Sequence, residues 1–267
     1  MGVSRSGYYA WLNRKPSRRA KEDQRILVKI QEVYVENRKA YGSPRIHLAL
    51  KKKGFGWGRN RIARLMRNVG LRAYRQYLRY RRYTKSKHGR VEAPNLVKQN
   101  FKVPVPNRVW ASDITQFWTG GGWLYLAVVM DLFSRRIIGW SMQRTLREGL
   151  VVDALEMAIQ QRGEEDPKIF HSDQGSQYSS FAVRDRLDEY GIQPSMSHRG
   201  SCYDNAVVES FFKTVKAELI RLVRFADRED ARSKLFEYIE VFYNRTRLHS
   251  SLGYKSPVEF EKQVTLS

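Results

Sequence analysis

Three strand-like segments that follow one another closely constrain the fold of this chain more than any other feature. Apolar residues alternate with polar ones over residues 109–118, run together over 123–131 and recur over 136–142. The links between these segments are short, and the first holds three consecutive glycines starting at Gly120, a composition typical of a tight turn. Because strands joined by short links pair antiparallel, the sequence predicts a meander of three antiparallel strands.

Helical and strand-like segments alternate along the rest of the chain. Hydrophobic periodicity predicts helices and short strands in turn, over about 147–162 (helix), 168–171 (strand), 181–190 (helix), 193–197 (strand), 204–222 (helix) and 227–244 (helix). Three hairpin-linked strands followed by this alternation predict a mixed α/β sheet with helices packed on it, in a domain that spans residues 107–267.

The positive charge of the chain is unevenly distributed. Its formal net charge is +22, and residues 1–90 contain 26 Lys and Arg but only 4 Asp and Glu, whereas residues 91–267 contain 23 of each kind. Because all of the excess lies in the first third, we expect a polyanionic partner, most often a nucleic acid. The single Cys202 excludes an internal disulfide, and no apolar run reaches membrane-spanning length. We therefore expect a cytoplasmic protein without a membrane partner.

The basic first third has helical periodicity, which distinguishes it from a disordered tail. A helix is expected over about 19–35, and Ser43, which precedes a proline, resembles the N-cap of a second helix. A third helix would begin at about Arg59 and end at Gly70. Two short helices joined by a glycine-rich turn predict a helix-turn-helix-like element over about 43–70.

Arginines are frequent on the outer face of this element and in the segment that follows it. We expect several of them to contact DNA phosphates, namely Arg61, Arg64, Arg67, Arg72 and Arg75. The alternative is a helical hairpin with a solvated basic face, and the charge distribution favours DNA contact over it. Prolines then predict a linker over residues 95–106, so that the basic helical region spans residues 1–94.

Three acidic residues lie where a purely structural role would be unusual. Asp113 lies within a mostly apolar strand, Asp173 follows a strand, and Glu209 lies on a helix that Asp204 or Asn205 could cap. The first two acids are separated by 59 residues and the last two by 35. An aspartate in an apolar sheet is costly to bury without a partner, so we expect the three carboxylates to meet in one site.

Phosphodiester chemistry needs an arrangement of this kind. Two divalent ions about 4 Å apart activate an oxygen nucleophile and relieve charge on the leaving oxygen. Carboxylate oxygens are the ligands that Mg²⁺ prefers, and three converging carboxylates would repel one another without cations. Glu209, Lys213 and Lys216 share one helix face, which suits a metal site beside DNA phosphates, although an ordinary surface ion-pair ladder has the same spacing.

Three strings of the sequence resemble the integrase core of bacterial insertion-sequence transposases. They cover residues 110–115, 171–178 and 201–213, and residues 243–252 are similar to the C-terminal segment of the same proteins. The closest resemblance is to the second-frame protein of the insertion-sequence-three family. It implies an RNase H-like fold with a retroviral-integrase-like catalytic core, whose acidic triad would use two Mg²⁺ or Mn²⁺ ions per active site.

The resemblance also implies roles for individual residues. Asp113, Asp173 and Glu209 correspond to the catalytic and metal-binding triad, and Lys216 to a residue that contacts DNA near the active site. Lys213 on the same helix and Arg199 in the loop before it are further DNA-contact candidates. Asp204 and Asn205 are expected to position the helix that carries the glutamate.

The resulting prediction is a DNA transposase that nicks transposon ends and joins the freed 3′-hydroxyl to another phosphodiester. The resemblance implies double-stranded DNA as substrate, a homodimer or higher oligomer that holds two DNA ends, and a partner protein from an upstream reading frame. Two alternatives remain open at this point. One is an RNase H-like nuclease or resolvase without strand joining, and the other is a non-catalytic DNA-binding regulator that uses residues 1–90.

Overall fold

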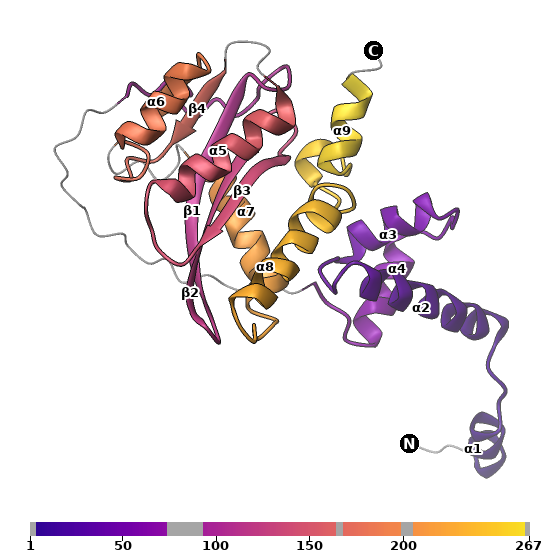
Figure 1. The fold of residues 1–267 in the computed structure, drawn as a ribbon. Coiled ribbons are helices and arrows are strands. Elements are labelled where there is room, and N and C mark those ends of the chain that lie inside the picture. The colour runs from indigo at the N-terminus through magenta and orange to yellow at the C-terminus, as the bar shows by residue number, and fades with distance from the viewer. Residues whose placement is uncertain (1–3, 74–92, 164–167, 199–204, 265–267) are drawn as a thin grey trace. The chain divides into compact units, whose positions relative to one another are not determined.

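The computed structural model describes residues 4–73, 93–163, 168–198 and 205–264 (Figure 1). The chain divides into two compact units, Met1–Arg75 and Gln76–Ser267. The predicted roles of Arg75, Arg199 and Asp204 lie outside the described residues.

The described part of the first unit is helical. Its helices are α1 (Arg5–Leu12), α2 (Arg18–Glu36), α3 (Ser43–Lys52) and α4 (Arg59–Asn68). Apolar residues at helical spacing form its core, and the fully buried ones include Ile26, Ile30, Ile46, Leu50 and Ile62. The three predicted helices are confirmed, whereas α1 was not predicted.

The ends of the predicted helices depend on local backbone geometry. Gly42, not Ser43, is the N-cap of α3, so the cap lies one residue earlier than the sequence suggested. At the end of α4, Gly70 adopts a φ of 71°, and the Leu71 N–H donates to the Met66 carbonyl oxygen at 2.8 Å. A left-handed glycine with this hydrogen bond is a Schellman ending, which confirms the role predicted for Gly70.

A five-stranded sheet forms the centre of the second unit. Its strands are β1 (Val109–Thr119), β2 (Gly122–Asp131), β3 (Ile137–Gln143), β4 (Ile169–Ser172) and β5 (Gln193–Met196). Their order across the sheet is β3-β2-β1-β4-β5. β1, β2 and β3 pair antiparallel, and β4 and β5 join the sheet in parallel. The predicted meander and mixed sheet are therefore confirmed.

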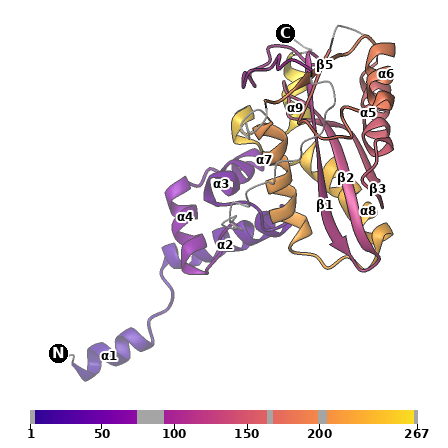
Figure 2. The same cartoon turned by 90° about the vertical axis from the view of Figure 1, so that its left-hand side faces the viewer.

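Helices cover both faces of this sheet (Figure 2). On one face α5 (Gly149–Arg162) and α6 (Phe181–Glu189) pack over a core that includes Trp110 and Val129. Gly139 of β3 lets α5 approach closely, because a Cβ there would lie 2.1 Å from the Ala154 carbonyl oxygen. On the opposite face lies α7 (Ala206–Val215), which contacts β1. Alternate residues of β1 therefore face different helices.

The two closing helices contain wider turns than the sequence suggested. α7 continues as the π-helical segment η1 (Lys216–Ile220), and α8 (Arg228–Phe236) continues as η2 (Glu237–Tyr243). η3 (Ser250–Leu252) and α9 (Pro257–Val264) follow and were not predicted. Arg247 donates two hydrogen bonds to the Glu218 carboxylate, at 2.8 and 2.7 Å, and both side chains are buried. This pair fixes η1, and with it α7, against the C-terminal segment.

The segment predicted as a linker begins in contact with the sheet. The Leu96 N–H donates to Ser195 Oγ at 2.9 Å, and Asn95 and Val97 are buried. The chain divides into its two compact units between residues 75 and 76, and the linker expected over residues 95–106 stays a prediction. Within the described part of the chain, no helix combines the length and the apolar character that a membrane crossing requires.

Candidate active site

Asp113 lies in the middle of β1, on the sheet face that α7 covers. Its Oδ1 accepts a hydrogen bond from the Ile114 N–H at 2.8 Å. Burial, the nearby Asp173 carboxylate and the Glu209 carboxylate raise the pKa of Asp113 to about 8, although the Ile114 N–H and Lys216 lower it. Asp173 and Glu209 are thus both close enough to act electrostatically on Asp113.

Asp173 follows directly after β4, at the end of the strand beside β1. Its Oδ1 accepts from the Gly175 N–H at 2.9 Å, which closes a tight turn. A Cβ at Gly175 would lie 2.9 Å from the same oxygen, so glycine suits this turn. Partial desolvation by the surrounding protein raises the pKa of the Asp173 carboxyl, although the residue remains exposed to solvent.

Glu209 lies in the first turn of α7 and pairs with Lys213 one turn later. The Lys213 Nζ and the Glu209 Oε2 are 3.3 Å apart. Lys216 is half-buried; burial and Arg221 lower the pKa of Lys216, whereas Asp113 raises it. The spacing of these residues therefore places them on one helix face as predicted, with Lys216 near Asp113.

Ser112 connects the segments that carry the three acids. Its carbonyl oxygen accepts from Asn205 Nδ2 at 2.9 Å, which ties the start of α7 to β1. Its Oγ lies 2.9 Å from the Tyr178 hydroxyl, which comes from the loop after Asp173. Asn205, predicted to support the helix, thus does so by bonding β1, while no cap bond from its side chain is present.

Sequence reasoning missed Ser112 and Tyr178 as part of the site. Both are buried, and both belong to the strings that carried the family resemblance. A serine or tyrosine in such a string gives no indication of its partner until the fold is known. His171, a further buried residue near Asp173, bonds Ser195 at 2.9 Å through Nδ1, which is a structural contact within the sheet.

The three carboxylates do not form a ready-made metal site. Among the described residues, no group of three or more His, Cys, Asp and Glu side chains is close enough to hold a metal ion. The convergence of Asp113, Asp173 and Glu209 as metal ligands stays a prediction, and both other carboxylates act electrostatically on Asp113. Like charges repel at short range, and Glu209 instead pairs with Lys213. The donor set itself, carboxylate oxygens alone, suits Mg²⁺ or Mn²⁺.

Several predicted DNA contacts of the first unit are engaged within the protein. Arg61 bonds Asp23 at 2.8 Å and Glu22 at 2.9 Å, and Arg64 bonds Asp23 at 2.7 Å. These hydrogen bonds lower the pKa of both acids. Arg67 and Arg72 are exposed, and the described residues contain no ion pair of either. The outer face of α4 therefore carries both paired and unpaired guanidinium groups.

Two kinds of family model match the chain. An integrase core domain matches residues 104–202, a second integrase core model matches residues 190–257, and an HTH-like domain matches residues 21–79. Among solved structures, the chain is similar in fold to a protein in the simian T-cell lymphotropic virus intasome bound to a PP2A regulatory subunit. That similarity has a TM-score of 0.50 at 14% identity and covers 87% of this chain and 74% of that one.

Several relatives are similar over nearly the whole chain. The 31 kDa protein of insertion element IS600 from Shigella sonnei is 41% identical over 98% of this chain and 96% of its own length. The IS904 transposase of Lactococcus lactis is 42% identical, with 94% and 99% coverage, and the IS3A transposase of Escherichia coli K12 is 40% identical, with 98% and 91%. Because these matches span both units, the chain belongs to the IS3-type family of insertion-sequence transposases.

Proposed function

We propose that this chain cuts DNA at transposon ends and joins the resulting 3′-hydroxyl to another DNA, with Asp113, Asp173 and Glu209 as its catalytic acids. The observation that supports these residues is the electrostatic coupling of Asp113 with both other carboxylates, which come from different elements. Carboxylates gathered in this way are expected at a site built for cations and phosphates.

The reaction consists of two displacements at phosphorus. Water attacks the phosphodiester at an element end and releases a 3′-hydroxyl. That hydroxyl then attacks a phosphodiester of another DNA, loses its proton to solvent and displaces a 3′ oxygen. Because bonds are exchanged between phosphodiesters, no nucleotide hydrolysis is required for joining.

Divalent cations fit the donor set of this site. Asp113, Asp173 and Glu209 would hold Mg²⁺ or Mn²⁺ through their carboxylate oxygens, and we propose two ions per site. Such ions, when bound, supply activation of the oxygen nucleophile and charge relief at the leaving oxygen. Glu209 would exchange its contact with Lys213 for a cation, which leaves the Lys213 ammonium available to a DNA phosphate.

Lys216 is the second cation that the site offers to DNA. Its half-buried ammonium lies close enough to Asp113 for the two charges to interact, so it can bind a phosphate beside the acids. Asn205 and Ser112 would act as positioning residues, because their hydrogen bond holds the helix of Glu209 against the strand of Asp113. Arg199 and Asp204 remain proposals drawn from the sequence alone.

The first unit would anchor the enzyme on double-stranded DNA. Its excess of positive charge and the exposed Arg67 and Arg72 suit the phosphate backbone. We also propose that the enzyme works as a dimer or larger assembly, because two ends must be held while they are joined. An upstream-frame partner protein is a further proposal, which rests on the family resemblance.

An Asp113→Asn variant tests the proposed chemistry directly. We expect strand cleavage and joining to fall on the order of 10³-fold or more, because a metal ligand is lost, while duplex binding persists. The matched control is Asp185→Asn, which removes an exposed carboxylate from α6 on the other face of the sheet. Retention of joining by Asp113→Asn would contradict the assignment.

Pre-cleaved ends separate the transferase from the alternative nuclease. Supplied with such ends and Mg²⁺, the wild-type chain should form joined products. Cleavage of uncut ends without any joining of pre-cleaved ones would favour a nuclease or resolvase. Duplex binding with neither reaction, under conditions where the fold is intact, would favour a DNA-binding regulator.

A further inference from the structure

Two exposed tryptophans mark the tip of the hairpin formed by β1 and β2. Trp118 is 63% exposed and Trp123 is 45% exposed. Their rings meet edge to face, with centroids 5.2 Å apart and an interplanar angle of 87°. An apolar ring on a strand is expected in the core, yet both rings remain largely exposed at this end of the hairpin. Exposed aromatic pairs of this size often mark an interaction site.

The hairpin tip, residues 118–123, is held rigidly. The Gly120 N–H donates to the Phe225 carbonyl oxygen at 3.0 Å, and a Cβ at Gly120 would lie only 1.9 Å from the Ala226 carbonyl oxygen. Arg228 Nε donates to the Trp123 carbonyl oxygen at 3.2 Å. The tip is therefore docked on the turn between η1 and α8, so that the two tryptophans are presented by a fixed platform.

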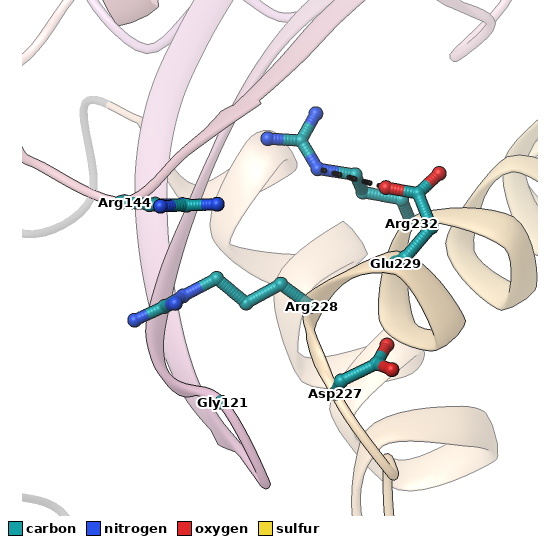
Figure 3. Close-up of a pocket in the computed structure, with 6 residues that line it drawn as sticks. All are labelled: Gly121, Arg144, Asp227, Arg228, Glu229 and Arg232. Atoms are coloured by element: carbon teal, nitrogen blue, oxygen red, sulfur yellow. Dashed lines mark ion pairs between the residues drawn. The ribbon is translucent and has the colours of Figure 1, made fainter.

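Arginines surround the hairpin tip on both sides. A pocket of about 430 Å³ is lined by Trp118 together with Arg221 and Arg224 from the turn. A second pocket, of about 340 Å³, lies beside Gly121 and is lined by Arg144, Asp227, Arg228, Glu229 and Arg232. Figure 3 shows Arg144 and Arg228 on the same side of the hairpin, from separate elements. Five guanidinium groups thus gather around one aromatic pair.

Few of these guanidinium groups are neutralised within the protein. Arg232 pairs with Glu229 at 4.0 Å, a long contact that contributes little at a surface. In the segments that the structure describes, no ion pair involves Arg144, Arg221 or Arg224. This surface carries several unpaired arginines beside exposed indole rings. It therefore suits a partner that offers negative charge and apolar contact together.

The hairpin tip is continuous with the candidate active site. Lys216 is the first residue of η1 and Arg221 follows its last, so this short segment leads from the helix of Glu209 to the turn that carries Arg224. Asp113 and Trp118 lie on the same strand, five residues apart along it, with their side chains on opposite faces of the sheet. At ~3.3 Å per strand residue this separation is about 17 Å. A B-form duplex covers that length in about five base pairs.

We propose that the hairpin tip and residues 221–224 form a second DNA-contact surface, which binds the sugar–phosphate backbone of a duplex about five base pairs from the reacting phosphodiester. This inference rests on the proposed function, because it names the DNA held beside the same site. Arginine binds phosphate oxygens through its planar fork, and the indole N–H is a donor while its ring packs on deoxyribose.

An Arg224→Ala variant of the full chain tests this surface by the salt dependence of duplex binding. Loss of one phosphate contact should reduce the slope of log affinity against log salt by about 1. The control is Lys262→Ala, an exposed cation on α9 whose neighbour Glu261 contacts Arg136 at the other end of the sheet. We expect the control to keep the wild-type slope, and equal slopes for both variants would overturn the proposal.

Substrate truncation locates the contact along the DNA. Duplexes are shortened stepwise on either side of the cleavage position, and binding and cleavage are measured for the wild type and for Trp118→Ala. Wild-type affinity should drop when fewer than about five base pairs remain on one side. Trp118→Ala should bind long duplexes as weakly as the wild type binds the truncated ones. A Trp118→Ala variant that changes oligomeric state without losing DNA affinity would identify a protein interface and overturn the proposal.

The two proposals fail in different ways. If the wild type cleaves and joins DNA but Arg224→Ala behaves as Lys262→Ala does, the surface is refuted and the catalytic assignment stands. If Arg224→Ala loses its phosphate contact while Asp113→Asn keeps full joining activity, the surface is supported and the assigned acids are refuted.

Discussion

The two units of the chain use arginine–carboxylate pairs in opposite ways. In the first unit, Arg61 and Arg64 meet Asp23 at a partly exposed surface. In the second, Glu218 and Arg247 meet where their side chains are only 8% and 7% exposed. Exposed pairs contribute little to stability. Removal of one partner of a buried pair, in contrast, leaves an unpaired charge in the interior, which is strongly destabilising.

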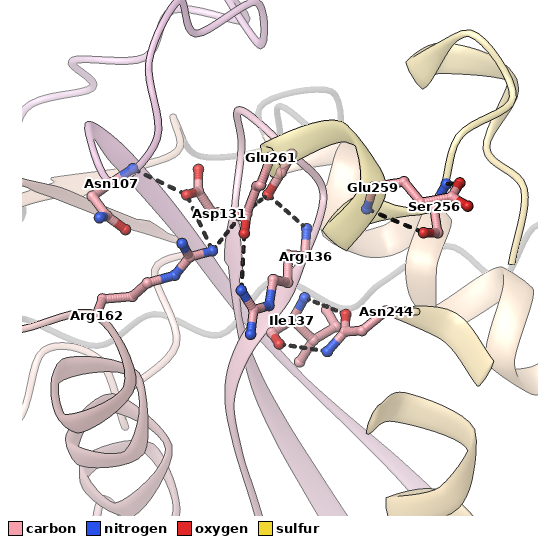
Figure 4. Close-up of polar contacts among 10 residues, drawn as sticks. Asn107, Asp131, Arg136, Ile137, Arg162, Asn244, Ser256, Glu259 and Glu261 are labelled. Atoms are coloured by element: carbon pink, nitrogen blue, oxygen red, sulfur yellow. Dashed lines mark hydrogen bonds and ion pairs between the residues drawn. The ribbon is translucent and has the colours of Figure 1, made fainter. Parts of the chain in front are cut away.

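A second, partly buried network repeats this pattern in the second unit (Figure 4). Glu261 of α9 accepts hydrogen bonds from Arg136 and Arg162, and Arg162 also lies 3.7 Å from the fully buried Asp131. In this network two arginines balance two carboxylates, and the contacts join segments that are distant in the sequence. The first unit instead keeps its excess positive charge on the outside. The difference indicates that the excess charge of the first unit serves a partner, whereas the paired charges of the second unit hold its distant segments together.

The largest effect should come from removing Arg247. An Arg247→Ala variant leaves the Glu218 carboxylate buried without its cation, and we expect a loss of about 3–5 kcal/mol in the free energy of unfolding. Arg64→Ala, the matched change in the first unit, should cost about 0–1 kcal/mol. Denaturant unfolding of the full chain measures both. Equal losses would remove the contrast between the units.

The pH dependence of stability tests the crowding of the acids. Because burial, Asp173 and Glu209 raise the pKa of Asp113 from 3.8 to about 8, the folded state holds this proton over a range in which the unfolded chain has lost it. The free energy of unfolding should therefore fall as the pH rises from about 4 to about 8 and level off above, which is the sign for a raised carboxyl pKa.

Asp113→Asn removes this titration. In a chelator, the variant should unfold at a higher temperature than the wild type at pH 8, and the advantage should shrink towards pH 5. Thermal unfolding at both pH values measures the difference, with Asp185→Asn as the control. A constant difference between variant and wild type at every pH would argue that the carboxylates do not crowd one another.

A smaller effect is expected from Tyr178→Phe, which leaves the fold of the second unit intact. Loss of the hydroxyl leaves the buried Ser112 Oγ without this partner, a cost of about 1–3 kcal/mol. We expect the Mg²⁺ concentration for half-maximal joining to rise roughly tenfold, which corresponds to a loss of about 1.4 kcal/mol in the free energy of Mg²⁺ binding. Tyr125→Phe, which removes the hydroxyl of a partly buried ring of the same unit, should not shift it.

The smallest effect concerns single arginines of α4. Arg67→Ala should reduce the salt slope of duplex binding by about 1, because Arg67 is exposed and is expected to reach one phosphate. Arg61→Ala should reduce it less, because Arg61 already pairs with Glu22 and Asp23. If Arg61→Ala had the larger effect, these ion pairs would have to open on DNA.

The sequence by itself determined most elements of this fold and the candidate acids of its site, although not α1, η3 or α9. Strand alternation, the glycine turn at Gly120 and helical periodicity are local properties, and the meander, α5 and α6 follow them closely. The uneven distribution of positive charge along the chain can be recognised without knowledge of the fold. Asp113, Asp173 and Glu209 were identifiable because each stands out against its own neighbours and belongs to a family string.

Only the tertiary structure decided which residues meet. Ser112 joins Asn205 and Tyr178 across 93 and 66 residues, and local pattern contains no information on such partners. The exposure of Trp118 is decided in the same way, because an apolar ring on a strand is buried only where another element covers it. Local sequence sets which conformations each segment prefers, whereas contacts between distant segments depend on how those segments pack.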